Sequence, residues 1–137
     1  MNELYFNKPD RLMTYPSQRV CAIIDERDNA SCALDALIKS GTREEDIEIL
    51  YGKEGIDLLN PGASGHGFFS KIADKFQSFG ELGRKLINSY ESALRQGGYV
   101  FVIPSYSDAD KGHIRSSLES GNAREINFFT SWYVEAM

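Results

Sequence analysis

The chain has 137 residues, a length that suits one domain, since domains are most often about 100–150 residues long. Hydrophobic residues make up 42% and charged residues 26%, which is typical of a globular protein with an apolar core. The net charge of −5 argues against a nucleic-acid-binding domain, which usually carries a basic surface. The longest fully apolar runs, 20–24 and 99–103, are far shorter than the roughly 20 residues of a transmembrane helix. We therefore expect no membrane span and, without an apolar segment like that of a signal peptide at the N-terminus, a cytoplasmic protein.

The two cysteines and two histidines give no sign of a metal or redox site. Cys21 lies in an apolar run that predicts a buried strand, and Cys32 lies in the first turn of a predicted helix. The spacing of the cysteines matches no zinc or redox motif, and nothing in the sequence brings them together with His66 and His113. We therefore predict two reduced thiols, no metal and no cofactor.

Residues 1–18 are polar, include two prolines and show no hydrophobic periodicity. We expect this stretch to form an N-terminal arm ahead of a single domain that spans 19–137. The apolar side chains expected to dock the arm on the domain are Leu4, Tyr5 and Phe6.

The domain begins with an apolar stretch at 19–25, which is typical of a central strand covered on both faces. A helix is predicted to follow as far as Ser40, with Gly41 ending it. Alternating apolar and polar residues over 47–51 then predict a second strand. The residues that could cap the start of the helix are Asp28, Asn29 and Ser31.

The section from Gly52 to Gly67 contains five glycines, which predict a loop. Beyond it, apolar side chains recur at helical spacing and predict a helix that ends at Gly80. A second helix is predicted over 81–96, and two glycines end it. We treat this helical hairpin as an insertion within about 53–98.

The last part of the chain repeats the order strand, helix, strand. A nearly all-apolar strand is predicted over 99–104. Ser107 or Asp108 is expected to cap a helix that runs through Ser120. A fourth strand, rich in aromatic residues, is predicted over 124–134.

Two segments of the chain thus share one plan, and each is a β-α-β unit. Two such units predict an α+β, ferredoxin-like, split β-α-β fold with a four-stranded antiparallel sheet and the hairpin inserted between the second and third strands. The two apolar strands would lie at the centre of the sheet and the two alternating strands at its edges. The two connecting helices would cover one face of the sheet. Either the inserted hairpin covers the other face, or that face meets a second subunit.

Five stretches of the chain carry a resemblance to known proteins. They are Ala33–Gly41 (ALDALIKSG), Glu45–Gly55 (EDIEILYGKEG), Gly65–Phe69 (GHGFF), Tyr90–Gly97 and Ile126–Trp132. The first two resemble the small bacterial general-stress-protein domain, also called the heat-induced stress protein domain. The other three resemble a group of uncharacterised bacterial proteins built on that plan. The resemblance spans about residues 19–134. It implies a stress-linked cytoplasmic protein and carries over no catalytic residue.

The glycine-rich segment is the best candidate for a ligand site in the sequence. It leads into a predicted helix N-terminus, where free backbone N–H groups and the helix dipole favour an anion. Its glycine spacing fits neither a Walker motif nor a dinucleotide-binding fingerprint, and a flexible loop without a ligand is the alternative. The residues that would bind the anion are Lys53, Gly62, Ser64, Gly65, His66, Gly67 and Lys71.

Three aromatic residues near the C-terminus could form the interface of a homodimer, because aromatic side chains are enriched in protein–protein interfaces. The alternative is that these side chains cap the core of a single subunit. They are Phe129, Trp132 and Tyr133.

These features favour a non-enzymatic stress-response or regulatory module that acts through self-association and partner binding. The alternative is a sensor of a small ligand, a nucleotide or another anion, at the loop over 62–71. A third reading is a small dimeric enzyme of the α+β-barrel kind, with an apolar pocket between the sheet and the hairpin. No residue is assigned a catalytic role, and we expect no nucleic-acid partner.

Overall fold

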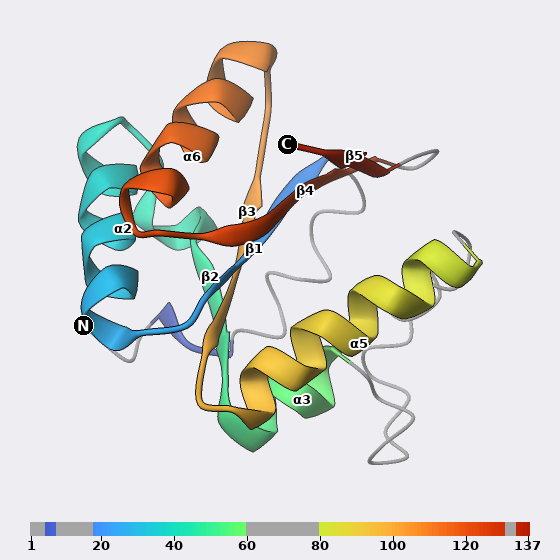
Figure 1. The fold of residues 1–137 in the computed structure, drawn as a ribbon. Coiled ribbons are helices and arrows are strands. Elements are labelled where there is room, and N and C mark those ends of the chain that lie inside the picture. Colours follow the sequence, from blue (N-terminus) through green and yellow to red (C-terminus); the bar gives the residue numbers. More distant parts are fainter. Residues whose placement is uncertain (1–4, 8–17, 60–79, 131–133) are drawn as a thin grey trace.

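Figure 1 shows the fold in a computed structural model, which describes residues 5–7, 18–59, 80–130 and 134–137. An antiparallel sheet of five strands, in the order β2-β3-β1-β4-β5, runs through the middle of the molecule. Helices lie on both faces of this sheet. The structure thus has the α+β class that the sequence predicted. Within the described ranges, no helix is both long and apolar enough to cross a membrane.

The two central strands are β1 (Arg19–Ile24) and β3 (Tyr99–Pro104), which pair with each other along their whole length. Both are buried almost throughout, which explains their nearly continuous apolar sequences. On the outer side of β3 lies β2 (Glu48–Tyr51), and on the outer side of β1 lies β4 (Arg124–Phe129). The two apolar runs of the sequence therefore mark the centre of the sheet, as predicted.

The sheet has one strand more than the four predicted from the sequence. The segment 124–134, expected as one strand, is divided between β4 and β5 (Val134–Ala136). β5 folds back and pairs antiparallel with β4, so that Val134 lies opposite Phe129. The sequence between the two strands includes neither glycine nor proline, so the usual signals of a turn are missing. The prediction of a single strand was wrong for this reason.

One face of the sheet is covered by α2 (Arg27–Lys39) and α6 (Asp108–Ser120), which also pack against each other (Figure 1). The two helices approach closely at Gly121. A Cβ atom there would lie 2.5 Å from the backbone oxygen of Asn29 and 2.7 Å from the Cβ atom of Ala33, so only glycine fits. Beneath these helices lies the first core cluster, whose members include Ala22, Leu37, Ile49, Phe101, Ile103 and Leu118.

The other face is covered by α3 (Gly52–Leu59) and α5 (Glu81–Arg95), which pack against each other and against the sheet (Figure 1). The described part of the segment between β2 and β3 therefore covers the face that the first two helices leave open, which agrees with one of the two arrangements expected. The predicted helix that ends at Gly80 lies outside the described residues. The second core cluster, on this face, includes Cys21, Ile23, Leu50, Tyr90, Leu94, Val100 and Phe129.

Residues 52–59 form the helix α3, although the glycines in this stretch predicted a loop. Gly52 has a φ of +66°, a conformation that favours glycine, at the junction of β2 and α3. Gly55 approaches β2, and a Cβ atom there would lie 3.1 Å from the carbonyl carbon of Leu50. These glycines allow a sharp junction and a close helix–strand contact, which is why the loop prediction was wrong here.

The two helices of the first face begin in different ways. Ser107 caps α6 as predicted, since its hydroxyl accepts a hydrogen bond from the N–H of Asp110. Helix α2 begins earlier than predicted, at Arg27, and its cap residue Glu26 makes no side-chain capping bond. The three residues predicted as caps all lie inside α2, because β1 ends at Ile24 and leaves a connection of only two residues.

Residues 5–7 of the arm lie along the edge of β2. Phe6 forms a parallel bridge with Ile49, and the side chain of Asn7 exchanges two hydrogen bonds of 3.0 Å with the backbone of Tyr51. These contacts occupy backbone groups at the edge of the sheet, where open strands invite pairing with other chains. Of the three arm residues predicted to dock on the domain, Tyr5 and Phe6 pack against the first core cluster, and Leu4 lies outside the described residues.

Candidate functional site

An open polar pocket of about 230 Å³ lies at one end of the first face, between the end of α2 and the start of α6. Connections between regular elements often carry binding residues, because a rigid scaffold positions them at the surface. The pocket is therefore the candidate site in the described part of the chain. Its walls include Gly41, Arg43, Asp46, Tyr106, Asp110 and His113.

The first wall follows from the way α2 ends. Gly41 has a φ of +103°, and the N–H of Thr42 returns to the carbonyl oxygen of Leu37 at 3.0 Å. The chain then forms a short 3-10 turn, Glu44–Asp46, just before β2. This turn places the side chain of Asp46 at the pocket wall, where the residue is only 5% exposed.

The second wall is the tight connection between β3 and α6. Ser105 is buried, and its hydroxyl donates to the carbonyl oxygen of Ser107 at 3.0 Å. The N–H of Tyr106 donates to Oδ2 of Asp110 at 3.2 Å. These bonds fix the backbone of Tyr106, whose side chain lines the pocket while the residue is 56% exposed.

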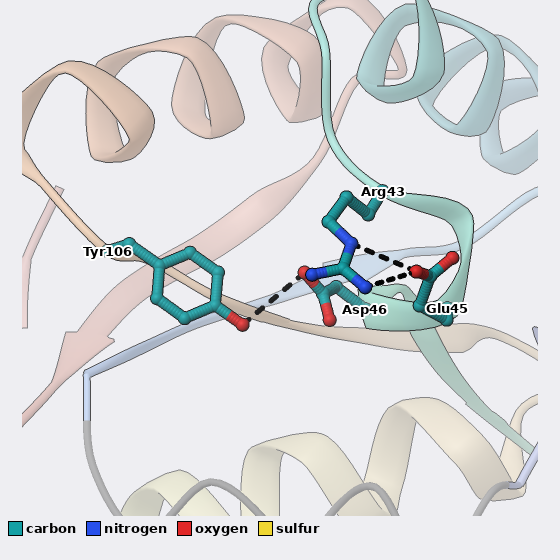
Figure 2. Close-up of polar contacts among 4 residues, drawn as sticks. All are labelled: Arg43, Glu45, Asp46 and Tyr106. Atoms are coloured by element: carbon teal, nitrogen blue, oxygen red, sulfur yellow. Dashed lines mark hydrogen bonds and ion pairs between the residues drawn. The ribbon is translucent and has the colours of Figure 1, made fainter.

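A hydrogen bond joins the two walls (Figure 2). The hydroxyl of Tyr106 donates to Oδ2 of Asp46 at 3.3 Å, between residues that are 60 positions apart in the sequence. Beside this bond, Arg43 donates from Nε and Nη2 to Oε1 of Glu45. A phenol, two carboxylates and a guanidinium group thus gather in one place, drawn from two separate connections of the fold.

This arrangement can recognise a small polar molecule. Charged side chains of both signs line the pocket, together with the imidazole of His113. Hydrogen bonds to charged groups are stronger than those between neutral groups, so a few such side chains are enough to orient a ligand.

The described residues include no group of three or more His, Cys, Asp or Glu side chains that could hold a metal ion. Cys21 is buried and Cys32 is exposed, and neither forms a disulfide. The acidic residues that follow the central strands do not converge, because these strands are antiparallel. Asp25 accepts two hydrogen bonds from Arg124, whereas Asp110 lies at the pocket.

The ligand residues predicted in the glycine-rich segment fall mostly outside the part of the chain that the structure describes. Lys53 is described, and it is an exposed residue of α3 rather than part of a loop. The anion site in this segment therefore stays a prediction. The predicted residues that lie outside the described ranges are Gly62, Ser64, Gly65, His66, Gly67 and Lys71.

Of the three residues of the predicted aromatic interface, the structure describes Phe129 alone. Phe129 is 6% exposed and belongs to the second core cluster. Trp132 and Tyr133 lie outside the described residues. The position of Phe129 fits the alternative that these aromatic side chains cap the core, and the homodimer interface stays a prediction.

The sequence gives only weak signals for the residues that form the pocket. Tyr106 stands between two serines in a strand-to-helix connection, where an aromatic side chain has no core to join. Asp46 precedes an alternating strand, and its burial cannot be deduced from local pattern because its partner lies 60 positions away. Neither residue is predicted from the sequence as part of a site.

Comparisons with models of protein families, with curated proteins and with solved structures find no match to this chain. The resemblance to the stress-protein domain therefore stays a prediction. A proposal about function therefore rests on the geometry of the pocket.

Proposed function

We propose that this protein is a binding module that takes a small polar molecule in the pocket between α2 and α6. The observation that carries the proposal is the carboxylate of Asp46, which lies at the wall of an open pocket, is 5% exposed and is bridged to Tyr106. Burial of a carboxylate is costly unless polar partners replace the lost water. Ligand sites use a small number of such placed polar groups to orient what they bind.

The size of the pocket limits the ligand. Pockets for drug-sized ligands measure about 300–1,000 Å³, and this pocket of about 230 Å³ is smaller. Its walls are rich in polar and charged side chains, and an apolar ligand would cover these groups without offering them hydrogen bonds. A compact polar compound is therefore the class that fits.

We also propose that the fold is a variant of the ferredoxin-like, split β-α-β arrangement. The strand order β2-β3-β1-β4, with antiparallel neighbours, supports this, as do α2 and α6 packed together on one face. In this plan β5 is an addition beside β4, and the segment with α3 and α5 is an insertion. The pocket then lies where the helix of the first β-α-β unit ends and the helix of the second begins.

The anion site over 62–71, where a nucleotide or another anion is the alternative predicted from the sequence, stays a separate proposal. A stress-response module that self-associates and binds a protein partner also stays a proposal, supported by the resemblance stated above. Ligand binding in the pocket is compatible with such a regulatory role.

The proposal can be tested by an NMR titration of the whole protein with a panel of amines, carboxylates, amino acids and sugars. A ligand in the pocket would shift the backbone amide signals of Gly41 and Tyr106 in a saturable way. His113→Trp should block the pocket, because His113 is exposed at its wall and the larger ring fills the space. Arg115→Trp is the matched control, since Arg115 is an exposed residue of the same helix that does not line the pocket.

We expect at least one compound to shift these signals in the wild-type and Arg115→Trp proteins, and the shifts to disappear in His113→Trp. If no compound of the panel shifts them, the proposal is wrong. It is equally wrong if His113→Trp binds as the wild type does.

A further inference from the structure

We infer that the outer edge of β2 binds the N-terminal arm of a second copy of this chain, through the same contacts by which it holds the arm of its own copy. The arm segment consists of Tyr5, Phe6 and Asn7, and it lies beside β2 at the edge of the sheet (Figure 1). This surface is separate from the pocket, because neither the arm segment nor β2 contributes to the pocket wall.

The first recognition element is the backbone of β2. This strand pairs with β3 on its inner side, while the backbone groups of Ile49 and Tyr51 meet the arm on its outer side. The N–H of Asn7 donates to the carbonyl oxygen of Ile49 at 3.0 Å. The side-chain amide of Asn7 donates to the carbonyl oxygen of Tyr51 and accepts from its N–H, each at 3.0 Å. The edge thus holds an extended segment through main-chain hydrogen bonds, which supply the affinity in strand addition.

The second recognition element is a pair of tyrosine rings beside this edge. Tyr51 and Tyr99 stack with their ring centroids 4.8 Å apart. The ring of Phe6 lies 5.5 Å from that of Tyr51 and 6.0 Å from that of Tyr99. Contacts between aromatic rings add stabilisation beyond that of buried area alone. The edge therefore selects a segment in which an aromatic side chain directly precedes an asparagine.

Tyr5 adds a contact with the turn that precedes β2. Burial raises the pKa of Tyr5, and the charge of Glu44 and a hydrogen bond with it raise this pKa further. The hydroxyl of Tyr5 therefore stays protonated at neutral pH and donates to the carboxylate of Glu44. The three residues of the arm segment thus each meet a different part of the surface.

The arm of a second copy carries the same three residues in the same order. Asn7 and Tyr51 are 44 positions apart, so their contact does not depend on a shared local stretch of sequence. Exchange of an identical element between two copies loses no contact, which makes it a low-cost route to a dimer.

The arm segment is also held loosely enough to leave the edge. All three of its residues are only partly buried, and Asn7 has a φ of +51°, which is uncommon for a residue other than glycine. Segments with few buried contacts open locally at a lower free energy than the core. Once the arm leaves, the unpaired backbone groups of β2 invite another extended segment.

The test separates the arm from the edge in two variants of the full chain. Phe6→Ala weakens the arm and keeps the edge, whereas Tyr51→Ala weakens the edge and keeps the arm. In a mixture, the intact arm of one variant can bind the intact edge of the other, where the attached arm competes poorly. Isotope-labelled Phe6→Ala reports this binding through the amide signals of Ile49 and Tyr51.

We expect unlabelled Tyr51→Ala to shift these signals in a saturable way. Its affinity for labelled Phe6→Ala should exceed that of unlabelled Phe6→Ala by about tenfold or more, because only Tyr51→Ala supplies the ring of Phe6. Sedimentation velocity should detect a dimer in the mixture. The matched control is the double variant with both substitutions, which should bind no better than Phe6→Ala does. If Tyr51→Ala fails to fold, the wild-type protein replaces it at a higher concentration, since its own edge retains part of its arms.

A synthetic peptide with the sequence of residues 3–8 tests the edge without a second domain. If this peptide shifts the signals of Ile49 and Tyr51 and the full-length partner does not, a second copy is not the occupant and the inference is wrong. It is also wrong if the double variant binds as tightly as Tyr51→Ala, because the ring of Phe6 then has no part in the contact. Unchanged edge signals in every mixture would likewise overturn it.

Discussion

Tyr90 shows how one buried polar group can join two elements. The residue belongs to α5 and has no exposed surface, and its hydroxyl lies 3.2 Å from the carbonyl oxygen of Glu125. Asn127 donates to the same hydroxyl from Nδ2 at 3.1 Å. Glu125 has a φ of +51°, and it lies where β4 changes register against β1. Burial raises the pKa of Tyr90 well above its ordinary value, so the hydroxyl remains a donor to this irregular point of the sheet.

We expect Tyr90→Phe to lower the free energy of unfolding by about 1–3 kcal/mol, because it leaves buried polar groups without a partner. Urea denaturation measures the change. Tyr51→Phe is the control, since Tyr51 is 37% exposed and water can solvate its surroundings, so its loss should stay below about 0.5 kcal/mol. Equal losses in the two variants would contradict the role of the Tyr90 hydroxyl.

The ion pair of Asp25 and Arg124 gives a prediction about pH. Hydrogen bonds from Arg124 lower the pKa of Asp25, and burial opposes this effect in part. Because the folded pKa lies below the unfolded value of about 3.9, the pair stabilises the fold above that pH and loses its effect as the pH falls through the folded value. The two side chains are 47% and 51% exposed, so the contribution at neutral pH stays below about 1 kcal/mol.

Asp25→Asn should therefore lower the free energy of unfolding at pH 7, and this loss should shrink as the pH falls through the lowered pKa of Asp25 in the folded protein. Urea denaturation at neutral and at acidic pH measures the difference. An NMR titration of the Asp25 carboxyl group provides the control, because Arg124→Met should return its pKa to the ordinary range. A destabilisation that is the same at both pH values would exclude the ion pair as its cause.

At the scale of elements, two glycines of the α6 region have opposite roles. Gly121 must be small, because a Cβ atom there would lie within 2.7 Å of α2 at both Asn29 and Ala33. Gly112 lies inside α6 with an ordinary helical backbone, and an added methyl group would meet nothing within 4 Å. We expect Gly121→Ala to destabilise the fold by about 1–3 kcal/mol through overpacking. Gly112→Ala should stabilise it by about 0.5–1 kcal/mol through helix propensity, and thermal unfolding measures both. A loss at Gly112 or a gain at Gly121 would contradict this assignment.

The elements that could be predicted are those set by local pattern. The apolar runs at 20–24 and 99–103 indicate central strands because both of their faces are buried. The cap of α6 follows from Ser107 and its reach to the N–H of Asp110. By contrast, β5 and α3 depend on contacts with other elements. The sequence before Val134 has no glycine or proline to mark the reversal, and Gly55 is explained only by its contact with β2.

At the scale of the whole molecule, the candidate site is the part that sequence could predict least. Asp46 and Tyr106 come from different β-α-β units, and only the packing of α2 beside α6 brings them together. The glycine-rich segment is predicted as a ligand site because its signal is local in the sequence, whereas the pocket depends on the tertiary arrangement.

The central strands of the sheet also link distant parts of the molecule, because β1 and β3 send alternate side chains into both core clusters. Ala22 and Phe101 enter the first cluster, and Ile23 and Val100 enter the second.

Because β1 and β3 belong to both clusters, their amides should be exposed only when the whole molecule unfolds. We expect the slowest hydrogen exchange at 20–24 and 99–103, with an exchange free energy equal to the global free energy of unfolding from urea denaturation. β5 is an edge strand of three residues with none fully buried, so its amides should exchange through local opening at a lower free energy. Native-state hydrogen exchange followed by NMR measures both.

If the layer of α3 and α5 unfolded independently, the amides of the central strands could still exchange slowly. The amides of α5 would then exchange with a free energy well below the global free energy of unfolding. Tyr90 links α5 to the point where β4 changes register against β1, and for this reason we expect the amides of α5 to exchange together with those of the sheet.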